Sequence, residues 1–143
     1  MPITLLALAV SVIFAVLGLI HAYWAIRGDI GSLSAGVPYV DGKPAFNPGR
    51  GLTLLVAAAL LGCALLVAAV GGLVDLPLAH WLLVWAAFAL ALVLFARSIG
   101  DFRLVGFFKK IRNSRFARLD TRYYSPLCLG LAAGVFAVAC AAA

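Results

Sequence analysis

Four long apolar runs, residues 3–24, 51–74, 78–100 and 126–143, constrain the fold of this 143-residue chain more than any other feature. Each run approaches the ~20 residues that a helix needs to cross the hydrocarbon core of a bilayer. A helix also satisfies its own backbone hydrogen bonds, which lipid cannot do. The runs therefore predict an all-α membrane protein, a single domain built as a four-transmembrane-helix bundle.

The composition supports this prediction, since 66% of the residues are hydrophobic and 11% are charged. A soluble domain of this size leaves much of its surface in water and could not hide so many apolar side chains. The first run resembles a signal peptide in length. However, no Lys or Arg precedes it and no small-residue cleavage site follows it, so we expect it to be the first spanning helix.

The positive charge is confined to two connections. All eleven Lys and Arg residues lie within residues 27–50 and 97–124, whereas the turn around Asp75 and both ends of the chain have none. The positive-inside rule then places both connections, including the basic segment 101–124, on the cytoplasmic side of a bacterial inner membrane. Both termini are expected on the outer side. Because the membrane explains the charge, no nucleic-acid partner is expected.

The first of these connections contains Asp41-Gly42 between two short β-prone stretches, which predicts a two-residue hairpin turn. Nearby prolines restrict it to a small ribbon. It is either a surface turn or a flap over the mouth of the bundle, and the surface turn is favoured because few loops of this length are lids.

The three cysteines, Cys63, Cys128 and Cys140, lie in apolar runs and form no CxxC pattern. This spacing indicates packing rather than a disulfide framework or a metal site. No cofactor is expected.

The predicted topology gathers polar residues at the cytoplasmic ends of the helices. A polar cluster at the mouth of an apolar bundle is a reasonable ligand site. The candidate ligand-binding residues are His21, Trp24, Arg50, Arg97, Asp101, Arg103, Asp120, Arg122 and Tyr123.

Two ion pairs are predicted within this group. Arg97 and Asp101 are four residues apart and would share a helix face. Asp120 lies between Arg118 and Arg122 in the sequence and would form the second pair. The neighbouring positive charge favours both carboxylates in their ionised form, so neither is expected to be a general acid. We favour a structural role, in which the pairs fasten the helix ends together.

The two histidines lead to different expectations. His21 would form a hydrogen bond between helices or take a ligand or proton role. It lacks the Cys or Glu neighbours of a metal site. His80, beside Trp81, is expected to anchor the outer interface.

Two further patterns concern contacts with lipid and with other helices. Residues 102–116 mix aromatic and aliphatic side chains with Lys and Arg, and such a segment can lie in the interface and bind anionic lipid. Gly130 and Gly134 form a GxxxG motif, which permits close helix contact within the chain or between two chains.

Three phrases carry a family resemblance: HAYWA at residues 21–25, GDFRLVGFFKK at 100–110 and DTRYYSPLCLG at 120–130. Together they resemble a family of small bacterial four-helix membrane proteins that is described only as a domain of unknown function. The resemblance covers nearly the whole chain. It implies a bacterial inner-membrane protein and brings no activity or cofactor with it.

The favoured functional hypothesis is a module that binds or transports a small amphipathic or anionic ligand. Arg97, Arg103 and Arg122 would hold the negative group, because guanidinium suits planar anions. His21 would be a neutral hydrogen-bond partner. Transport would require a homo-oligomer, because four helices enclose little space.

Two alternatives stay open. The chain would be an accessory subunit bound to a partner membrane protein, or an enzyme acting on a lipid or isoprenoid head group. In the enzyme, His21 and Asp101 or Asp120 would be the acid and base. The lack of Glu, of paired free carboxylates and of a metal-ligand set disfavours the enzyme.

Overall fold

The computed structural model describes residues 3–28 and 36–143. It confirms the all-α four-helix bundle. The elements are α1 (Ile3–Arg27), β1 (Tyr39–Val40), β2 (Lys43–Pro44), α2 (Arg50–Val70), α3 (His80–Ile99), α4 (Arg115–Leu119), the π-helical turn η2 (Asp120–Tyr124) and α5 (Ser125–Ala142). Four helical stretches, with α4 to α5 as one of them, are long and apolar enough to cross a membrane. The chain is therefore a multi-pass membrane protein.

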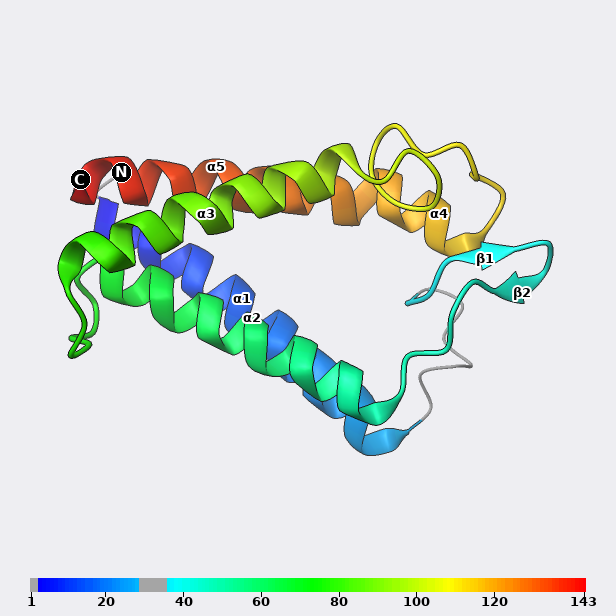
Figure 1. The fold of residues 1–143 in the computed structure, drawn as a ribbon, viewed down its shortest axis with the longest axis horizontal. Helices are drawn as coiled ribbons and strands as arrows, with labels where there is room; N and C mark the ends of the chain where they lie inside the picture. Colours follow the sequence, from blue (N-terminus) through cyan, green and yellow to red (C-terminus); the bar gives the residue numbers. More distant parts are fainter. Residues whose placement is uncertain (1–2, 29–35) are drawn as a thin grey trace.

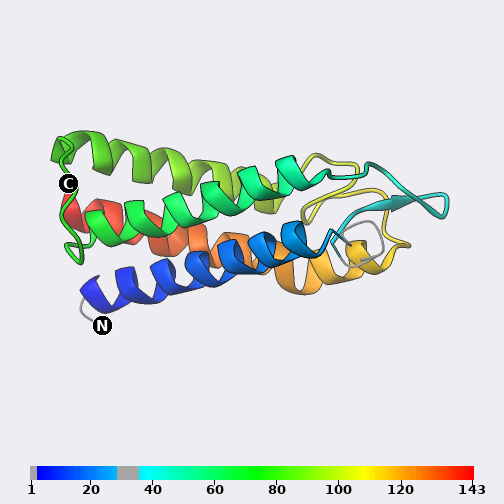
Figure 2. The same ribbon diagram turned by 90° about the horizontal axis from the view of Figure 1, so that it is seen from below.

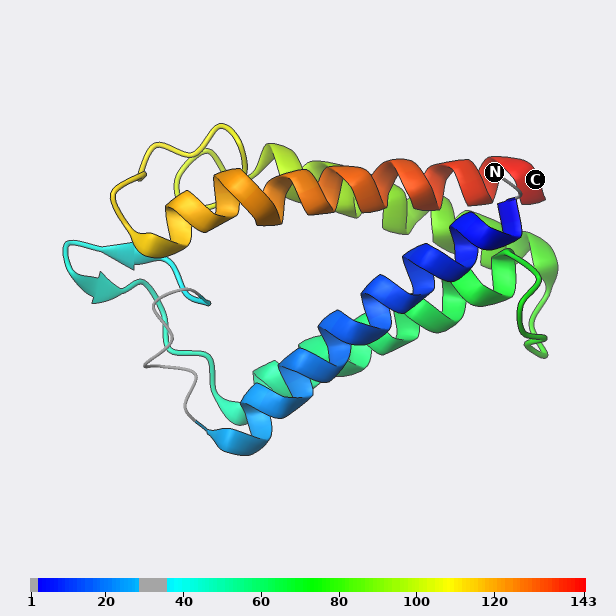
Figure 3. The same ribbon diagram turned by 180° about the vertical axis from the view of Figure 1, so that it is seen from behind.

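The helices form two pairs, α1 with α2 and α3 with α5 (Figure 1). The pairs meet at the end that carries both termini and diverge toward the end that carries the two long connections. The view from behind shows the same divergence (Figure 3), and the view from below shows the helices running lengthwise side by side (Figure 2). All the basic connections therefore lie at one end of the molecule.

Small and branched side chains form the core where the two pairs meet. Ala7, Val10 and Phe14 of α1 are buried against Val67 of α2 and Val135 of α5. Many large apolar side chains face outward instead, such as Trp85 and Leu92 of α3, which are 67% and 68% exposed. In a membrane these side chains contact lipid, which explains why the chain tolerates them on its surface.

The fourth helix begins earlier than its apolar run predicts. The sequence predicts a start at Pro126, but the helical stretch begins at Arg115. Ser114 caps this start, because its hydroxyl accepts a hydrogen bond of 3.0 Å from the Ala117 N–H. The predicted basic segment 101–124 is thus a loop up to Ser114 and a helix after it.

The π-helical turn η2 explains how Pro126 is accommodated inside a helix. A proline in a helix lacks an N–H donor and crowds the carbonyl four residues earlier. The widened turn over Asp120–Tyr124 ends two residues before Pro126 and changes the local hydrogen-bond spacing. A proline that predicted a helix start therefore marks a widened turn within a longer helix.

The predicted hairpin is confirmed. Tyr39 pairs with Pro44 and Val40 with Lys43 in antiparallel register. The two turn residues, Asp41 and Gly42, have φ angles of 50° and 77°. Positive φ at both turn positions is the geometry that matches the twist of a two-residue hairpin.

The two glycines of the GxxxG motif have different surroundings. A Cβ atom at Gly134 would lie 2.8 Å from Cγ2 of Val10 in α1, whereas a Cβ at Gly130 would meet nothing within 4 Å. The close contact at Gly134 is therefore within the chain. Gly130 leaves an open position on α5.

We predict that Gly134→Val destabilises the protein and that Gly130→Val does so far less. The added side chain at 134 must displace Val10, and overpacking of this kind costs about 1–3 kcal/mol. Thermal unfolding of the two purified variants, followed by circular dichroism, compares the same substitution on the same helix. Equal melting temperatures would contradict the packing described here.

Candidate functional site

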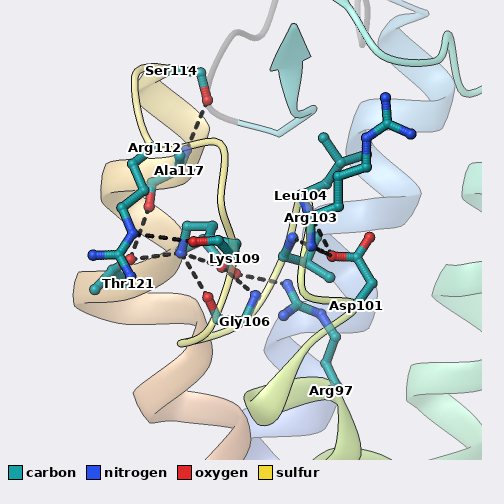
Figure 4. Close-up of polar contacts among 12 residues, drawn as sticks. Arg97, Asp101, Arg103, Leu104, Gly106, Lys109, Arg112, Ser114, Ala117 and Thr121 are labelled. Atoms are coloured by element: carbon teal, nitrogen blue, oxygen red, sulfur yellow. Dashed lines mark hydrogen bonds and ion pairs between the residues drawn. The ribbon is translucent and has the colours of Figure 1, made fainter.

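A buried carboxylate, Asp120, is the centre of the polar structure at the basic end. Its side chain is fully buried, and Oδ1 accepts a hydrogen bond of 2.8 Å from Nη2 of Arg97. Oδ2 accepts from Nζ of Lys109 at 2.9 Å and from the N–H of Gly106 at 2.7 Å. Two cations and one backbone donor therefore compensate a single buried negative charge. Figure 4 shows Arg97, Gly106 and Lys109 close to one another.

Lys109 is equally buried and completely hydrogen-bonded. Besides Asp120, its ammonium group donates to the Gly106 carbonyl at 2.8 Å and to Oγ1 of Thr121 at 2.6 Å. An ammonium group has three hydrogens, so these three bonds use all of them. We call Arg97, Gly106, Lys109, Asp120 and Thr121 the Asp120 cluster.

The loop between α3 and α4 is organised by a second aspartate. Oδ1 of Asp101 accepts from the backbone N–H groups of Arg103, Leu104 and Val105 at 2.9, 2.7 and 3.0 Å. Slight desolvation raises the pKa of the Asp101 carboxyl, but these backbone donors outweigh it and hold the pKa below its ordinary value. The exposed carboxylate thus orders the first half of the loop (Figure 4).

Two glycines allow this loop to close on itself. A Cβ at Gly100 would collide with the Val105 carbonyl, and a Cβ at Gly106 would collide with Gly100. Both glycines also have positive φ angles, 97° and 88°. The Phe107 N–H then donates to the Ser98 carbonyl at 2.9 Å, which ties the loop to the end of α3.

The structure contradicts both predicted ion pairs, because each aspartate has other partners than the predicted ones. Arg97 does not pair with Asp101, because α3 ends at Ile99 and Asp101 bonds to its own loop. Asp120 pairs with Arg97 and Lys109 rather than with Arg118 or Arg122. Arg122 lies over the ring of Tyr123, with 5.5 Å from Cζ to the ring centroid.

Lys109 is the residue that the sequence interpretation missed. It stands next to Lys110 in a basic stretch, so it read as one more exposed cation. What sets Lys109 apart from Lys110 in the sequence is that it directly follows two aromatic residues, Phe107 and Phe108. Only the folded loop shows that Lys109 is buried while Lys110 is exposed.

The candidate residues on α1 and α2 belong to the other helix pair. His21, Trp24 and Arg50 lie where α1 ends and α2 begins, on the arm that diverges from α3 and α4 (Figure 1). Nδ1 of His21 is 2.8 Å from the Leu17 carbonyl of its own helix, so the predicted bond between helices is replaced by one within α1. His80 instead links two helices, since its Nε2 is 2.8 Å from the Ala142 carbonyl.

A basic hollow of about 800 Å³ lies between the hairpin and the end of the α3–α4 loop. Its cationic lining is Lys110, Arg112 and Arg115, all exposed. Nε of Arg112 donates to the Lys109 carbonyl at 3.1 Å, which joins the hollow to the Asp120 cluster. The hairpin contributes Tyr39 and Asp41. In the described residues, no group of three or more His, Cys, Asp or Glu side chains is placed to hold a metal ion.

Comparison with known protein families finds one that matches this chain. Residues 14–135 match the family described as "Protein of unknown function (DUF3995)". The chain belongs to this family. The match covers most of the chain and includes all three phrases that carried the resemblance, HAYWA, GDFRLVGFFKK and DTRYYSPLCLG. No curated protein and no solved structure matches the chain.

We predict that Asp120→Asn strongly destabilises the protein, because it leaves the buried Lys109 without its counter-charge. Removing one partner of a buried ion pair costs about 3–5 kcal/mol. Asp75→Asn, in the exposed turn at the opposite end, is the matched control and should change stability little. Thermal unfolding in one detergent compares the two, and equal losses would contradict the central role of Asp120.

The contribution of Asp101 to stability should depend on pH. Because its folded-state pKa lies below the ordinary value of 3.8, the contribution is complete above that value and is lost as pH falls through the folded pKa. The difference in melting temperature between the wild type and Asp101→Ala should therefore be present at neutral pH and shrink below about pH 4. A difference that is the same at all pH values would refute this role.

Proposed function

We propose that this protein binds an anionic amphipathic molecule at its basic end, with the basic hollow as the site for the negative group. The observation that carries the proposal is the gathering of Lys110, Arg112 and Arg115 around one hollow next to the bundle. Guanidinium and ammonium groups together match a phosphate or carboxylate head. The apolar helix bundle beside the hollow suits the hydrocarbon part of such a ligand.

The orientation of the chain supports this proposal. All eleven Lys and Arg residues lie in the connections at the end opposite the termini, which the positive-inside rule assigns to the cytoplasmic side of a bacterial inner membrane. The hollow would then lie at the level of the head groups. Anionic lipids of that leaflet attract such segments by about 1 kcal/mol per cation.

The Asp120 cluster gives the hollow a fixed frame. Lys109 and Arg97 are committed to Asp120, so they are not available to a ligand, and the predicted anion-binding role of Arg97 becomes a structural one in this proposal. Arg103 and Arg122 are exposed but do not line the hollow, so their predicted anion-binding roles pass to Lys110, Arg112 and Arg115 in this proposal. The hydrogen bonds of Lys109 hold the part of the loop that carries Lys110 and Arg112.

An accessory role is the second candidate, and a separate observation favours it. An apolar groove of about 660 Å³ lies between α3 and α5, lined mainly by Trp85, Phe88, Phe95, Leu129 and Phe136. A helix of a partner membrane protein would fit such a groove, and co-purification of a partner at fixed stoichiometry would support this function.

The enzyme hypothesis has no such observation behind it. His21 would have to meet Asp101 or Asp120, yet His21 lies on α1, in the diverging helix pair, and bonds to Leu17 (Figure 1). Asp101 accepts hydrogen bonds from three backbone N–H groups of its own loop, and Asp120 is committed to two cations. The geometry of the described residues therefore favours binding.

The proposal is tested with protein in nanodiscs that contain phosphatidylglycerol as a minor component in phosphatidylcholine. The double variant Lys110→Gln/Arg115→Gln should retain roughly ten- to thirty-fold less phosphatidylglycerol in native mass spectrometry, since two cations are removed at about 1 kcal/mol each. Neither side chain has a hydrogen bond among those that hold the loop.

The matched control is Arg27→Gln/Arg50→Gln, which removes the same charge from the same end, at the ends of α1 and α2 and away from the hollow. Both side chains are exposed and neither lines the hollow. Equal losses in the two double variants would mean that the net charge alone attracts the lipid, and the proposed site would be wrong.

A further inference from the structure

A second, smaller pocket lies on the other helix pair, where α1 ends and α2 begins. It has a volume of about 250 Å³. Its walls are His21 and Trp24 from α1, Leu52, Thr53 and Val56 from α2, and Phe46 from the connection between them. Apart from His21, none of the described residues that line it has an ionisable side chain. This His21 pocket therefore differs in character from the basic hollow, and it suits a neutral molecule.

The hydrogen bond of His21 fixes which of its nitrogens is free. Nδ1 lies 2.8 Å from the Leu17 carbonyl, and a carbonyl oxygen only accepts. Nδ1 must therefore carry a hydrogen, so Nε2 of the neutral ring is left as an acceptor. The Trp24 ring packs against the imidazole, with 5.1 Å between centroids, and restrains its orientation.

Thr53 adds a second acceptor. Its side chain is buried, and Oγ1 donates its only hydrogen to the Gly49 carbonyl at 3.2 Å. The hydroxyl oxygen keeps its lone pairs and can only accept from a further partner. Among the described residues of the lining, His21 and Thr53 donate their hydrogens to backbone carbonyls, which leaves the indole N–H of Trp24 as the side-chain donor for a ligand. A ligand group that can both donate and accept a hydrogen bond matches these two acceptors and this donor.

We propose that the His21 pocket binds the hydroxyl group of a neutral molecule with an apolar body, an alcohol or a phenol. The hydroxyl donates to Nε2 of His21 or to Oγ1 of Thr53, and its oxygen accepts from Trp24. The pocket, at about 250 Å³, is large enough for the hydroxyl-bearing head of an alcohol or the ring of a phenol. Leu52 and Val56 are 52% and 37% exposed, so the apolar body continues along α2 toward the hydrocarbon. This binding does not depend on the anion site.

The test uses pairs of probes that differ in the hydroxyl hydrogen alone. 4-Hexylphenol is compared with 4-hexylanisole, and 1-decanol with its methyl ether, in phosphatidylcholine nanodiscs after correction for partition into lipid. The protein has three tryptophans, so the variant Trp81→Phe/Trp85→Phe leaves Trp24 as the fluorescent reporter. At least one hydroxyl compound should bind about tenfold or more tightly than its ether, because a buried acceptor left unpaired is costly. A larger preference in the hexylphenol pair identifies the ligand class as phenols, and a larger preference in the decanol pair identifies it as alkyl alcohols.

Two substitutions assign the preference to this pocket. His21→Phe keeps a ring but removes the acceptor, and Thr53→Val keeps the shape but removes the hydroxyl. Each should reduce the preference for the hydroxyl compound, and His21→Phe should nearly abolish it. Equal binding of hydroxyl compound and ether in the reporter protein would overturn the proposal even if a variant fails to fold. A preference that survives in both folded variants would also overturn it. Retention of phosphatidylglycerol through Lys110 and Arg115 is a separate readout that these substitutions should not change.

Discussion

The buried charge of Asp120 is the interaction on which the basic end of this protein depends. A carboxylate removed from water is costly unless cations and donors surround it. Here Arg97 comes from α3, Lys109 and Gly106 from the loop, and Asp120 from the helix that follows. One side chain thus joins the third span, the fourth span and the connection between them.

This arrangement gives a physical meaning to two of the phrases that carried the family resemblance. GDFRLVGFFKK contains Gly100, Asp101, Gly106 and Lys109, and DTRYYSPLCLG begins with Asp120. The first phrase supplies a loop that closes tightly and places a buried ammonium group, and the second supplies its counter-charge. The π-helical turn before Pro126 belongs to the same phrase as Asp120. The two phrases are therefore two halves of one structure.

The sequence predicts the spans and the hairpin well, because apolar length and the Asp41-Gly42 turn are local signals. It does not predict the partners of Asp120, because Arg97 and Lys109 approach it only through the closure of a loop. Spacing along a helix favoured Arg97 with Asp101, but Gly100 ends the helix between them. The divergence of the helix pairs also separates the end of α1, which carries His21, from the start of the fourth helical stretch, which carries Asp120, and the sequence carries no signal for it (Figure 3).

The most direct test of this account is a double-mutant cycle between Lys109 and Asp120, with Lys109→Met, Asp120→Leu and the double variant compared by thermal unfolding. Asp120→Leu leaves the buried Lys109 without a counter-charge, and Lys109→Met leaves Asp120 with Arg97 as its one cationic partner. The double variant removes both fully buried charges and leaves only Arg97, which is partly exposed. The account predicts that the double variant is more stable than either single variant, with a coupling of about 1–3 kcal/mol. Additive losses would contradict it, because they would mean that the two side chains do not compensate each other.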